Sequence, residues 1–172
     1  MLTSFLISWQ NLVSEPWDAT TAHPSSPPTC SLAFPPADNH PAAIAPAQPL
    51  PADWSLFSWK YAKHYYQTTV AGSQPIRFPV TVRPGARGEV AVGFLRAPTH
   101  KYDLARARCE VSGTGQGAML DGTWVLQSSL TQVGVVATGL QAGEYEVSCA
   151  TLPEGEQDKG KRVFRIASVM SV

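Results

Sequence analysis

The residue types that carry most enzyme chemistry are present in this sequence, but not in the combinations that catalysis requires. A serine hydrolase needs a serine on a sharp turn, a histidine base and a carboxylate that orients the histidine. The sequence contains neither a Gly-x-Ser-x-Gly nor a Gly-Asp-Ser run. Asp38-Asn39-His40 brings an acid close to a histidine, but it lies in a proline-rich stretch that offers no scaffold to hold them. We therefore expect no catalytic residues.

Cofactor and metal sites are equally poorly supported. Ser112–Gly117 is glycine-rich, but no helix is predicted after it, and a phosphate-binding loop needs that helix N-terminus. Glu154, Glu156 and Asp158 form an acidic loop without the ligand spacing of a calcium site. No cysteine or histidine pair has the spacing of zinc ligands. We expect no cofactor and no metal.

The sequence contains three cysteines, so at least one of them has no disulfide partner within the chain. Cys109 and Cys149 each lie in a run typical of a strand, with Trp124 between them in the sequence, as in immunoglobulin-type domains. We expect them either to meet across the core of a sandwich as a disulfide or to be two separate buried thiols. Cys30 lies in the proline-rich part and has no obvious partner in this chain.

Aromatic side chains crowd the thirteen positions from 54 to 66. Those that we identify as candidate glycan or partner contacts are Trp54, Trp59, Tyr61, Tyr65 and Tyr66. Flat rings suit stacking on sugars, and the arginines and lysines that follow suit hydroxyl or acid groups. The alternative is that these rings fasten the proline-rich part to the folded domain and close its core. We expect the group to be divided, some rings filling the core and others covered only by residues 28–52.

The elements that must position these residues are predicted to be strands. From Asp53 onward apolar residues recur at every second position, and turn residues separate the runs. The predicted strands are His64–Thr69, Ile76–Val82, Glu89–Leu95, Arg106–Ser112, Thr123–Gln127, Gln132–Thr138, Glu144–Thr151 and Arg162–Val172. No helical run is long enough for a βαβ crossover, so we predict an all-β fold: a two-sheet antiparallel β-sandwich of about eight strands, immunoglobulin-like or jelly-roll-like.

The same alternation predicts the core of this sandwich. Its candidate residues are Phe78, Val80, Val82, Val90, Val92, Phe94, Trp124, Val135, Leu140, Tyr145, Val147, Phe164 and Ile166. Full burial of each large side chain is worth about 1.5–3 kcal/mol. Such a core can sustain the domain without a cofactor.

Composition divides the chain into two parts. Residues 1–52 hold ten of the fifteen prolines and carry a net charge of −3, whereas 53–172 hold all thirteen basic residues and carry +3. We predict a Pro/Ala-rich extension over 1–52, with a short helix at 4–14, and a β-sandwich accessory domain over 53–172. The apolar start lacks a basic residue and is too short to span a bilayer, so no signal peptide and no membrane insertion are expected. A net charge of zero argues against a nucleic-acid partner.

One family resemblance extends over residues 28–172. It is carried by spaced motifs: Pro28-Thr29-Cys30-Ser31, Trp59-Lys60-Tyr61, Lys63-His64-Tyr65-Tyr66, Ile76-Arg77-Phe78-Pro79-Val80, Gly88-Glu89-Val90-Ala91-Val92-Gly93-Phe94-Leu95-Arg96, Leu120-Asp121-Gly122-Thr123-Trp124 and Gly143-Glu144-Tyr145-Glu146-Val147-Ser148-Cys149. Together they resemble the C-terminal β-sandwich accessory domain of fungal capsule-associated and related SGNH-hydrolase-type proteins. The chain departs from that pattern at Cys109-Glu110-Val111-Ser112, where such proteins often have Cys-Trp-Val-Asp.

The resemblance implies a non-catalytic module, normally attached to an SGNH-type esterase or acyltransferase-like domain that acts on glycans. The catalytic serine and the Asp-x-x-His pair of that neighbour have no counterpart here, so its activity does not carry over. The implied partner is an SGNH-type catalytic domain in cis or in trans, and the implied location is the secretory pathway or the cell exterior. We expect a truncated or separately encoded accessory module.

A second class of function stays open beside this one. The chain can instead be a self-standing carbohydrate-binding or adhesion module, with glycan as its partner. A third class, an esterase in its own right, would need the catalytic motifs that the sequence lacks.

Overall fold

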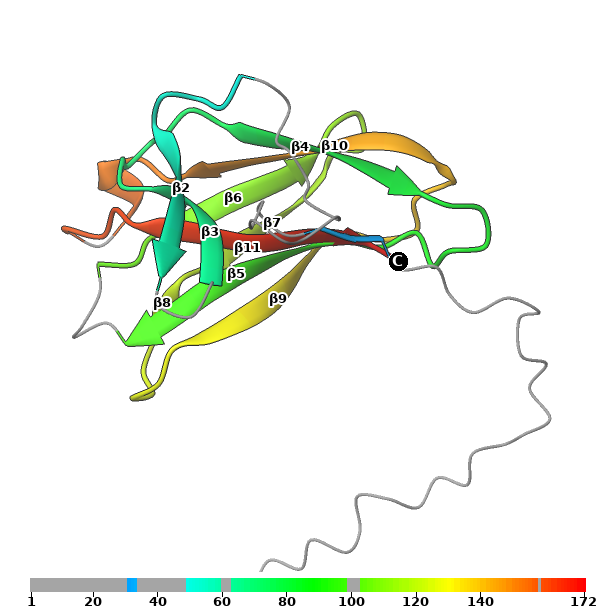
Figure 1. Ribbon diagram of the computed structural model, residues 1–172. Coiled ribbons are helices and arrows are strands. Elements are labelled where there is room, and N and C mark those ends of the chain that lie inside the picture. Colours follow the sequence, from blue (N-terminus) through cyan, green and yellow to red (C-terminus); the bar gives the residue numbers. More distant parts are fainter. Residues whose placement is uncertain (1–30, 34–48, 60–62, 99–102, 158) are drawn as a thin grey trace, which may run out of the picture.

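The structure of the protein, a computed structural model, describes residues 31–33, 49–59, 63–98, 103–157 and 159–172. Within them the chain is almost entirely β-structure (Figure 1). The strands are β1 (Ser31–Ala33), β2 (Trp54–Trp59), β3 (Lys63–Thr68), β4 (Ile76–Val82), β5 (Val90–Pro98), β6 (Arg106–Val111), β7 (Gln116–Asp121), β8 (Thr123–Trp124), β9 (Leu130–Ala137), β10 (Gly143–Thr151) and β11 (Phe164–Ser171). A single 3-10 turn among these residues, η2 (Glu154–Glu156), precedes β11.

The larger sheet has seven strands. Its path runs β2-β3-β11-β5-β8, while β1 also pairs with β11 and β9 also pairs with β5. β3 pairs with the beginning of β11 and β1 with its end, so these two strands lie along the same edge of β11. These pairs are antiparallel, except that β5 and β8 run parallel over two residues.

The smaller sheet has four strands in the order β4-β10-β6-β7, and all of its pairs are antiparallel. Figure 1 shows the two sheets as stacked layers, with β4, β10 and β6 above β11, β5 and β9. The predicted two-sheet β-sandwich is therefore confirmed.

The main core lies between the layers. The predicted core residues that it buries are Phe78, Val80, Val82, Val90, Val92, Phe94, Val147, Phe164 and Ile166. They follow the alternation that the sequence shows, because every second residue of a strand faces the same side of its sheet. Leu140 and Tyr145 are only half-buried and pack against the margin of this core, and Trp124 is half-buried at the end of the sandwich.

The prediction that Val135 belongs to the core is wrong. Val135 is 49% exposed, whereas the neighbouring Val136 is buried. The register between β5 and β9 shifts from Val90 opposite Ala137 to Ala91 opposite Val135, which leaves Val136 as the extra residue of a β-bulge. The bulge interrupts the alternation, so Val136 and Ala137 are both buried.

Three strands were not predicted from the sequence. β2 lies within the aromatic run, β7 begins in the glycine-rich stretch that was interpreted as a loop, and β1 comes from the proline-rich part. The predicted strand Thr123–Gln127 is shortened to β8, because residues 125–128 form bends. The division at 52/53 stays a prediction, since most of residues 1–48 lie outside the described residues, among them the predicted helix at 4–14 and Cys30.

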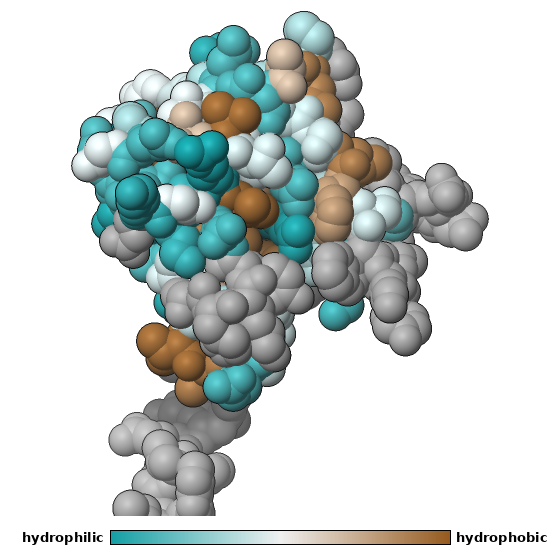
Figure 2. Space-filling view, turned by 90° about the vertical axis from the view of Figure 1, so that its left-hand side faces the viewer, coloured by the Kyte–Doolittle hydropathy of each residue, from teal (hydrophilic) through white to brown (hydrophobic). Residues whose placement is uncertain are grey.

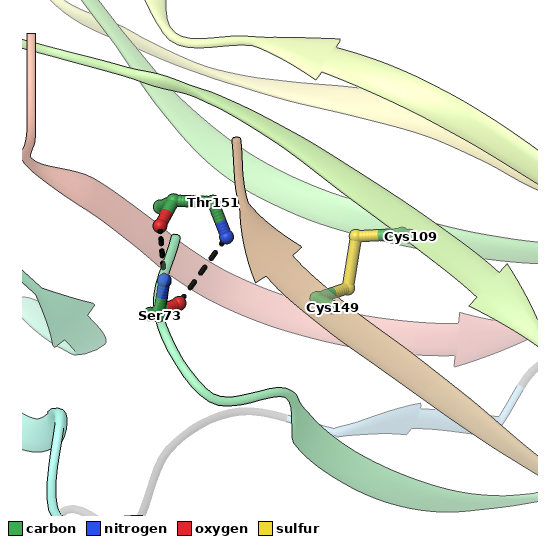
Figure 3. Close-up of a disulfide and its surroundings, with 4 residues drawn as sticks. All are labelled: Ser73, Cys109, Cys149 and Thr151. Carbon is green, nitrogen blue, oxygen red and sulfur yellow. Dashed lines mark hydrogen bonds between the residues drawn. A yellow bond between two sulfur atoms is a disulfide. The ribbon is translucent and has the colours of Figure 1, made fainter. Parts of the chain in front are cut away.

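Cys109 and Cys149 form a disulfide (Figure 3), with an S–S distance of 2.04 Å. The bond joins neighbouring strands of one sheet, because Cys109 on β6 lies directly opposite Cys149 on β10. The expectation of a bond across the core, between the two sheets, is therefore wrong. The physical reason is strand order: β10 lies between β4 and β6, so both cysteines belong to the four-stranded sheet. Both residues are fully buried.

Candidate functional site

Two of the five candidate contact aromatics lie in the main core. The indole Nε1 of Trp54 donates a hydrogen bond to the backbone carbonyl of Gln74 at 2.8 Å. The ring of Tyr66 packs against Phe78 with 5.5 Å between ring centroids. Both rings are buried and contribute to the packing of the sandwich, so the candidate surface does not include them.

Trp59 and Tyr61 cannot be placed in the same way. Trp59 is the last residue of β2, but its side chain lies outside the described part of the chain, and so does the whole of Tyr61. Their role as glycan or partner contacts stays a prediction.

Tyr65 lies on the other face of the seven-stranded sheet, which we call the outer face because it points away from the four-stranded sheet. Successive side chains of a strand point to opposite faces, so Tyr66 turns to the main core and Tyr65 turns outward. Tyr65 belongs there to a second buried cluster, separate from the main core. Its members are Tyr65, Leu95, Ala97, Leu104 and Ala167, with Phe57 and Val163 packed against them.

A small cavity opens beside this cluster, with a volume of about 110 Å³. We call it the outer-face hollow and define it by its lining residues: Lys63, Tyr65, Leu95, Ser129, Leu130, Thr131 and Arg165. Strand register brings them together, since Phe57 lies opposite Tyr65, Leu95 lies opposite Thr131, and β11 lies between β3 and β5. Four strands that are distant in the sequence therefore build one site.

The charge of the outer-face hollow is positive. Of the described residues that line it, Lys63 and Arg165 are cationic and none is a carboxylate. Arg165 is held in place, because its Nε donates to Gln67 Oε1 at 2.7 Å and its guanidinium lies 4.2 Å from the centroid of the Phe57 ring. Lys63 is exposed and takes part in none of the ion pairs between described residues. Two cations beside the apolar side chains of Leu95 and Leu130 favour an anionic group.

Tyr65 forms a wall of this hollow. Burial raises the pKa of its phenol above the ordinary value of 10.0, while the charge of Arg165 and a side-chain hydrogen bond with Thr131 lower it to a smaller extent. The phenol is therefore neutral at physiological pH. The residue is only 6% exposed, which leaves too little of its ring for a sugar to stack on. Tyr65 shapes the site rather than offering the flat platform that its sequence context suggested.

The size of the hollow limits what it can hold. A volume of about 110 Å³ equals about three to four water molecules of the liquid, whereas pockets that enclose a small molecule usually exceed about 300 Å³. The outer-face hollow therefore accepts one functional group or the edge of one sugar ring. The hydroxyls of Ser129 and Thr131 and the two cations supply the hydrogen bonds. Among the described residues that line it, none is a histidine or a carboxylate.

A second depression, of about 330 Å³, lies over β6 and β7 of the four-stranded sheet. Its lining residues are Arg108, Glu110, Gly115, Gly117, Ala118 and Met119. The opposite charges of Arg108 and Glu110 cancel, and the two glycines present no side chain. This surface offers fewer specific contacts than the outer-face hollow.

The end of the sandwich that lies at the left in Figure 1 is largely polar. Figure 2 shows this end: hydrophilic residues cover most of the described surface, and apolar residues form separate small groups. Val125 is the most exposed large apolar residue, at 88%, and it follows Trp124, over which Arg96 stacks at 4.2 Å. Scattered exposed apolar residues are normal on a protein surface, so this view gives no broad apolar docking face among the described residues.

No group of three or more His, Cys, Asp or Glu residues among the described residues is arranged to hold a metal ion. None of the helical segments in this part of the chain is long and apolar enough to cross a membrane.

Sequence reasoning identified one of the seven described residues of the outer-face hollow, Tyr65, and missed the other six, among them Leu95, Thr131 and Arg165. These three are ordinary strand residues in the sequence, with no motif around them. The sequence offers one signal for two of them: Leu95 follows the core residue Phe94, and Arg165 lies between the core residues Phe164 and Ile166, so alternation along the strand points both side chains away from the core.

No family model and no curated protein sequence matches this chain. Among solved structures, a two-domain esterase (CEX) active on acetylated mannans aligns with a TM-score of 0.52 at 15% identity, over 89% of this chain and 41% of its own. The same esterase co-crystallised with mannopentaose gives 0.52 at 13% identity, over 75% and 36%. This chain thus spans about two fifths of the esterase's length.

A third solved structure covers a single domain. The C-terminal CBM6 of LamC, a marine laminarinase from Zobellia galactanivorans, aligns with a TM-score of 0.47 at 11% identity, over 84% of this chain and 99% of its own. At these identities, the likeness to the esterase shows that the β-sandwich fold is shared.

Proposed function

We propose that this chain is a non-catalytic accessory module that holds a saccharide in the outer-face hollow, beside a catalytic domain that acts on glycans. The observation that carries the proposal is the lining of the hollow. It combines the hydroxyl-bearing residues Ser129 and Thr131 and the cations Lys63 and Arg165 with the apolar Leu95. Sugars present the matching groups, because their hydroxyls accept and donate hydrogen bonds while their C–H faces are apolar.

The accessory role has two supports. The chain shares its fold with part of a two-domain esterase that is active on acetylated mannans, and it spans about two fifths of that protein. The spaced motifs over residues 28–172 resemble domains that follow an SGNH-type esterase or acyltransferase-like domain. We therefore propose an SGNH-type catalytic domain as the partner, in cis or in trans. The same resemblance and the disulfide favour the secretory pathway or the cell exterior.

A self-standing carbohydrate-binding or adhesion module is the second candidate. The hydroxyl-bearing and cationic residues that line the hollow suit this candidate as well. The discriminating observation is the neighbouring reading frame. A frame with a Gly-Asp-Ser turn and an Asp-x-x-His pair, expressed together with this chain, supports attachment. A transcript without such a frame, and no binding to a separate SGNH-type protein, supports the self-standing module.

Saccharide binding is tested by isothermal titration of the full chain with a panel of neutral and acidic oligosaccharides, mannopentaose among the neutral ones. Thr131→Leu removes a hydroxyl and narrows the hollow, so it should weaken binding at least about tenfold. Val133→Leu is the matched control, because Val133 is exposed on the same strand and does not line the hollow. No binding by the wild-type chain, or equal loss in both variants, would contradict the proposal.

The non-catalytic part of the proposal has its own test. The full chain alone should release no acetate from acetylated mannan, measured over hours at high protein concentration. Release above the buffer rate that persists after repurification would contradict a non-catalytic module.

A further inference from the structure

We infer that Arg96 is a positioning residue of the saccharide site. It does not line the outer-face hollow, but it holds one edge of the hollow in place. That edge consists of residues 129–131, all three of which line the hollow, and we call it the rim. The inference rests on the proposed function and adds to it a residue that acts on the site through other residues.

Arg96 lies on the opposite face of the sheet from the hollow. On β5, Phe94 points into the main core and Leu95 points to the outer face, so alternation turns Arg96 back to the face of Phe94. The residue directly opposite Arg96 on β9 is Leu130, the middle residue of the rim. The half-buried Arg96 therefore supports the rim from behind.

One guanidinium binds both ends of the connection that leads from β8 to the rim. On β8, Nε and Nη2 of Arg96 donate to the Thr123 carbonyl at 2.9 and 2.7 Å. The guanidinium also stacks on the Trp124 ring, 4.2 Å from its centroid. On β9, Nη1 donates to Gln132 Oε1 at 2.8 Å. Because β8 pairs with β5 over only two residues, these side-chain contacts add substantially to its attachment.

The bond to Gln132 helps to fix the direction in which the rim faces. Gln132 lies opposite Phe94, on the core side of the sheet, so the preceding Thr131 points to the outer face. Residues 125–128, between the two attachments, form bends, so the order of this stretch depends on how its ends are fixed. A rim that is ordered before binding loses less conformational entropy when a saccharide binds, which raises the affinity.

Arg96→Met tests this role, because it removes the three donors and keeps an unbranched apolar side chain next to Trp124. The full chain is titrated by calorimetry with an oligosaccharide that the wild type binds, taken from the neutral and acidic panel described above. The affinity should fall about fivefold to tenfold. Arg96→Lys keeps the charge but lacks the planar fork, so its affinity should lie between the two.

Arg83→Met is the matched control, since Arg83 is exposed and does not line the hollow. It should change the affinity by less than about twofold. Gln132→Met is a second test that leaves Arg96 bound to Thr123 and releases β9, and it should weaken binding about threefold. It decides the matter if Arg96→Met does not fold, which urea denaturation of each variant establishes.

Backbone motion in the unliganded chain separates positioning from a general loss of stability. Order parameters from ¹⁵N relaxation should be close to about 0.85 for the amides of Leu130 and Thr131 in the wild type and should fall towards about 0.6 in Arg96→Met. The amides of Tyr65 and Leu95, elsewhere in the lining, should keep their values. A general loss of stability would not confine the change to the rim.

The outcomes separate this inference from the proposed function. Wild-type affinity in both Arg96→Met and Gln132→Met, or an unchanged order parameter of the rim in folded Arg96→Met, would overturn the inference and leave the saccharide module standing. An equal loss in Arg83→Met would also overturn it, because the affinity would then follow the charge of the chain. No binding of any saccharide by the wild type overturns both.

Discussion

Ser73 and Thr151 are far apart in the sequence but exchange two hydrogen bonds in the folded chain (Figure 3). The Ser73 N–H donates to Thr151 Oγ1 at 3.0 Å, and the Thr151 N–H donates to Ser73 Oγ at 3.2 Å. The Thr151 hydroxyl in turn donates to the carbonyl of Val70 at 2.6 Å. Both residues are buried, so these bonds replace water and attach the segment before β4 to the end of β10.

Ser73→Ala should lower the free energy of unfolding by about 1–3 kcal/mol, because it leaves the Thr151 N–H buried without an acceptor. The measurement is urea denaturation of the full chain. Ser55→Ala is the control, since Ser55 is exposed and its hydroxyl bond to the Gln67 carbonyl is long, at 3.5 Å; its effect should stay below about 0.5 kcal/mol. Equal losses in the two variants would contradict the role given to the buried pair.

The two buried tyrosine phenols make the free energy of unfolding depend on pH in the alkaline range. Burial raises the pKa values of Tyr65 and Tyr66 above 10.0, so the folded state holds these protons more tightly than the unfolded chain does. The stability that these raised pKa values contribute is fully present below about pH 9. It is lost as the pH rises through 10 towards the raised pKa values of the folded state. Unfolding free energies measured between about pH 7 and 11 should show this decline, and Tyr65→Phe should reduce it. A decline that is unchanged in the variant would contradict the assignment to Tyr65.

At the scale of elements, the connection between β4 and β5 requires glycine for two different reasons. Gly85 and Gly88 both have left-handed backbone angles, with φ of 80° and 71°. A Cβ atom on Gly85 would meet nothing within 4 Å, but one on Gly88 would lie 2.3 Å from the carbonyl oxygen of Leu140. The Leu140 N–H also donates to the Gly88 carbonyl at 3.0 Å, so the two backbones cannot separate without losing that bond.

This pair gives an internally controlled prediction. Gly85→Ala should cost about 1–2 kcal/mol, the strain of a left-handed alanine alone. Gly88→Ala should cost about 3–4 kcal/mol, because the clash with Leu140 is added. Thermal and urea unfolding of both variants measure the difference, and a Gly88 variant no less stable than the Gly85 variant would show that the turn can move away.

The disulfide connects two elements that already pair through the backbone. Cys109 and Cys149 are separated by 40 residues, and a loop of that length is worth about 4 kcal/mol in the chain-entropy model. The double variant Cys109→Ala/Cys149→Ala should unfold at a correspondingly lower urea concentration, and Cys30→Ser should match the wild type. An unchanged midpoint in the double variant would show that the bond does not form in the folded protein.

Prediction of the elements succeeded where alternation was clean. β4 is the best example, because Ile76, Phe78, Val80 and Val82 are all buried and the residues between them are all exposed. It failed where another feature masked the period. The glycines at the start of β7 indicated a loop. The bulge at Val136 exchanged the inward and outward positions of β9. β1 is too short for any period to be visible.

At the scale of the whole molecule, the candidate site depends on strand order, which single-strand patterns do not contain. Tyr65, Leu95, Thr131 and Arg165 come from four strands, and they meet only because β11 inserts between β3 and β5 while β9 follows β5. The position of the disulfide could not be predicted for the same reason. Both cysteines were identified in the sequence, but only strand order shows that they lie in the same sheet. The crowded aromatics are divided in part as expected, because neighbours in a strand alternate between faces, and Trp54 and Tyr66 fill the core. Which of the rings would turn inward could not be predicted from their crowding alone.

NMR titration of the labelled full chain shows directly whether the outer face of the seven-stranded sheet holds a saccharide. Addition of the oligosaccharide that binds best should shift the amide signals of Tyr65, Leu95, Thr131 and Arg165, with saturation at the affinity found by calorimetry. The signals of Gly117 and Met119, at the depression over β6 and β7, should stay unchanged. Saturable shifts confined to β6 and β7, or no shifts at all, would contradict the account.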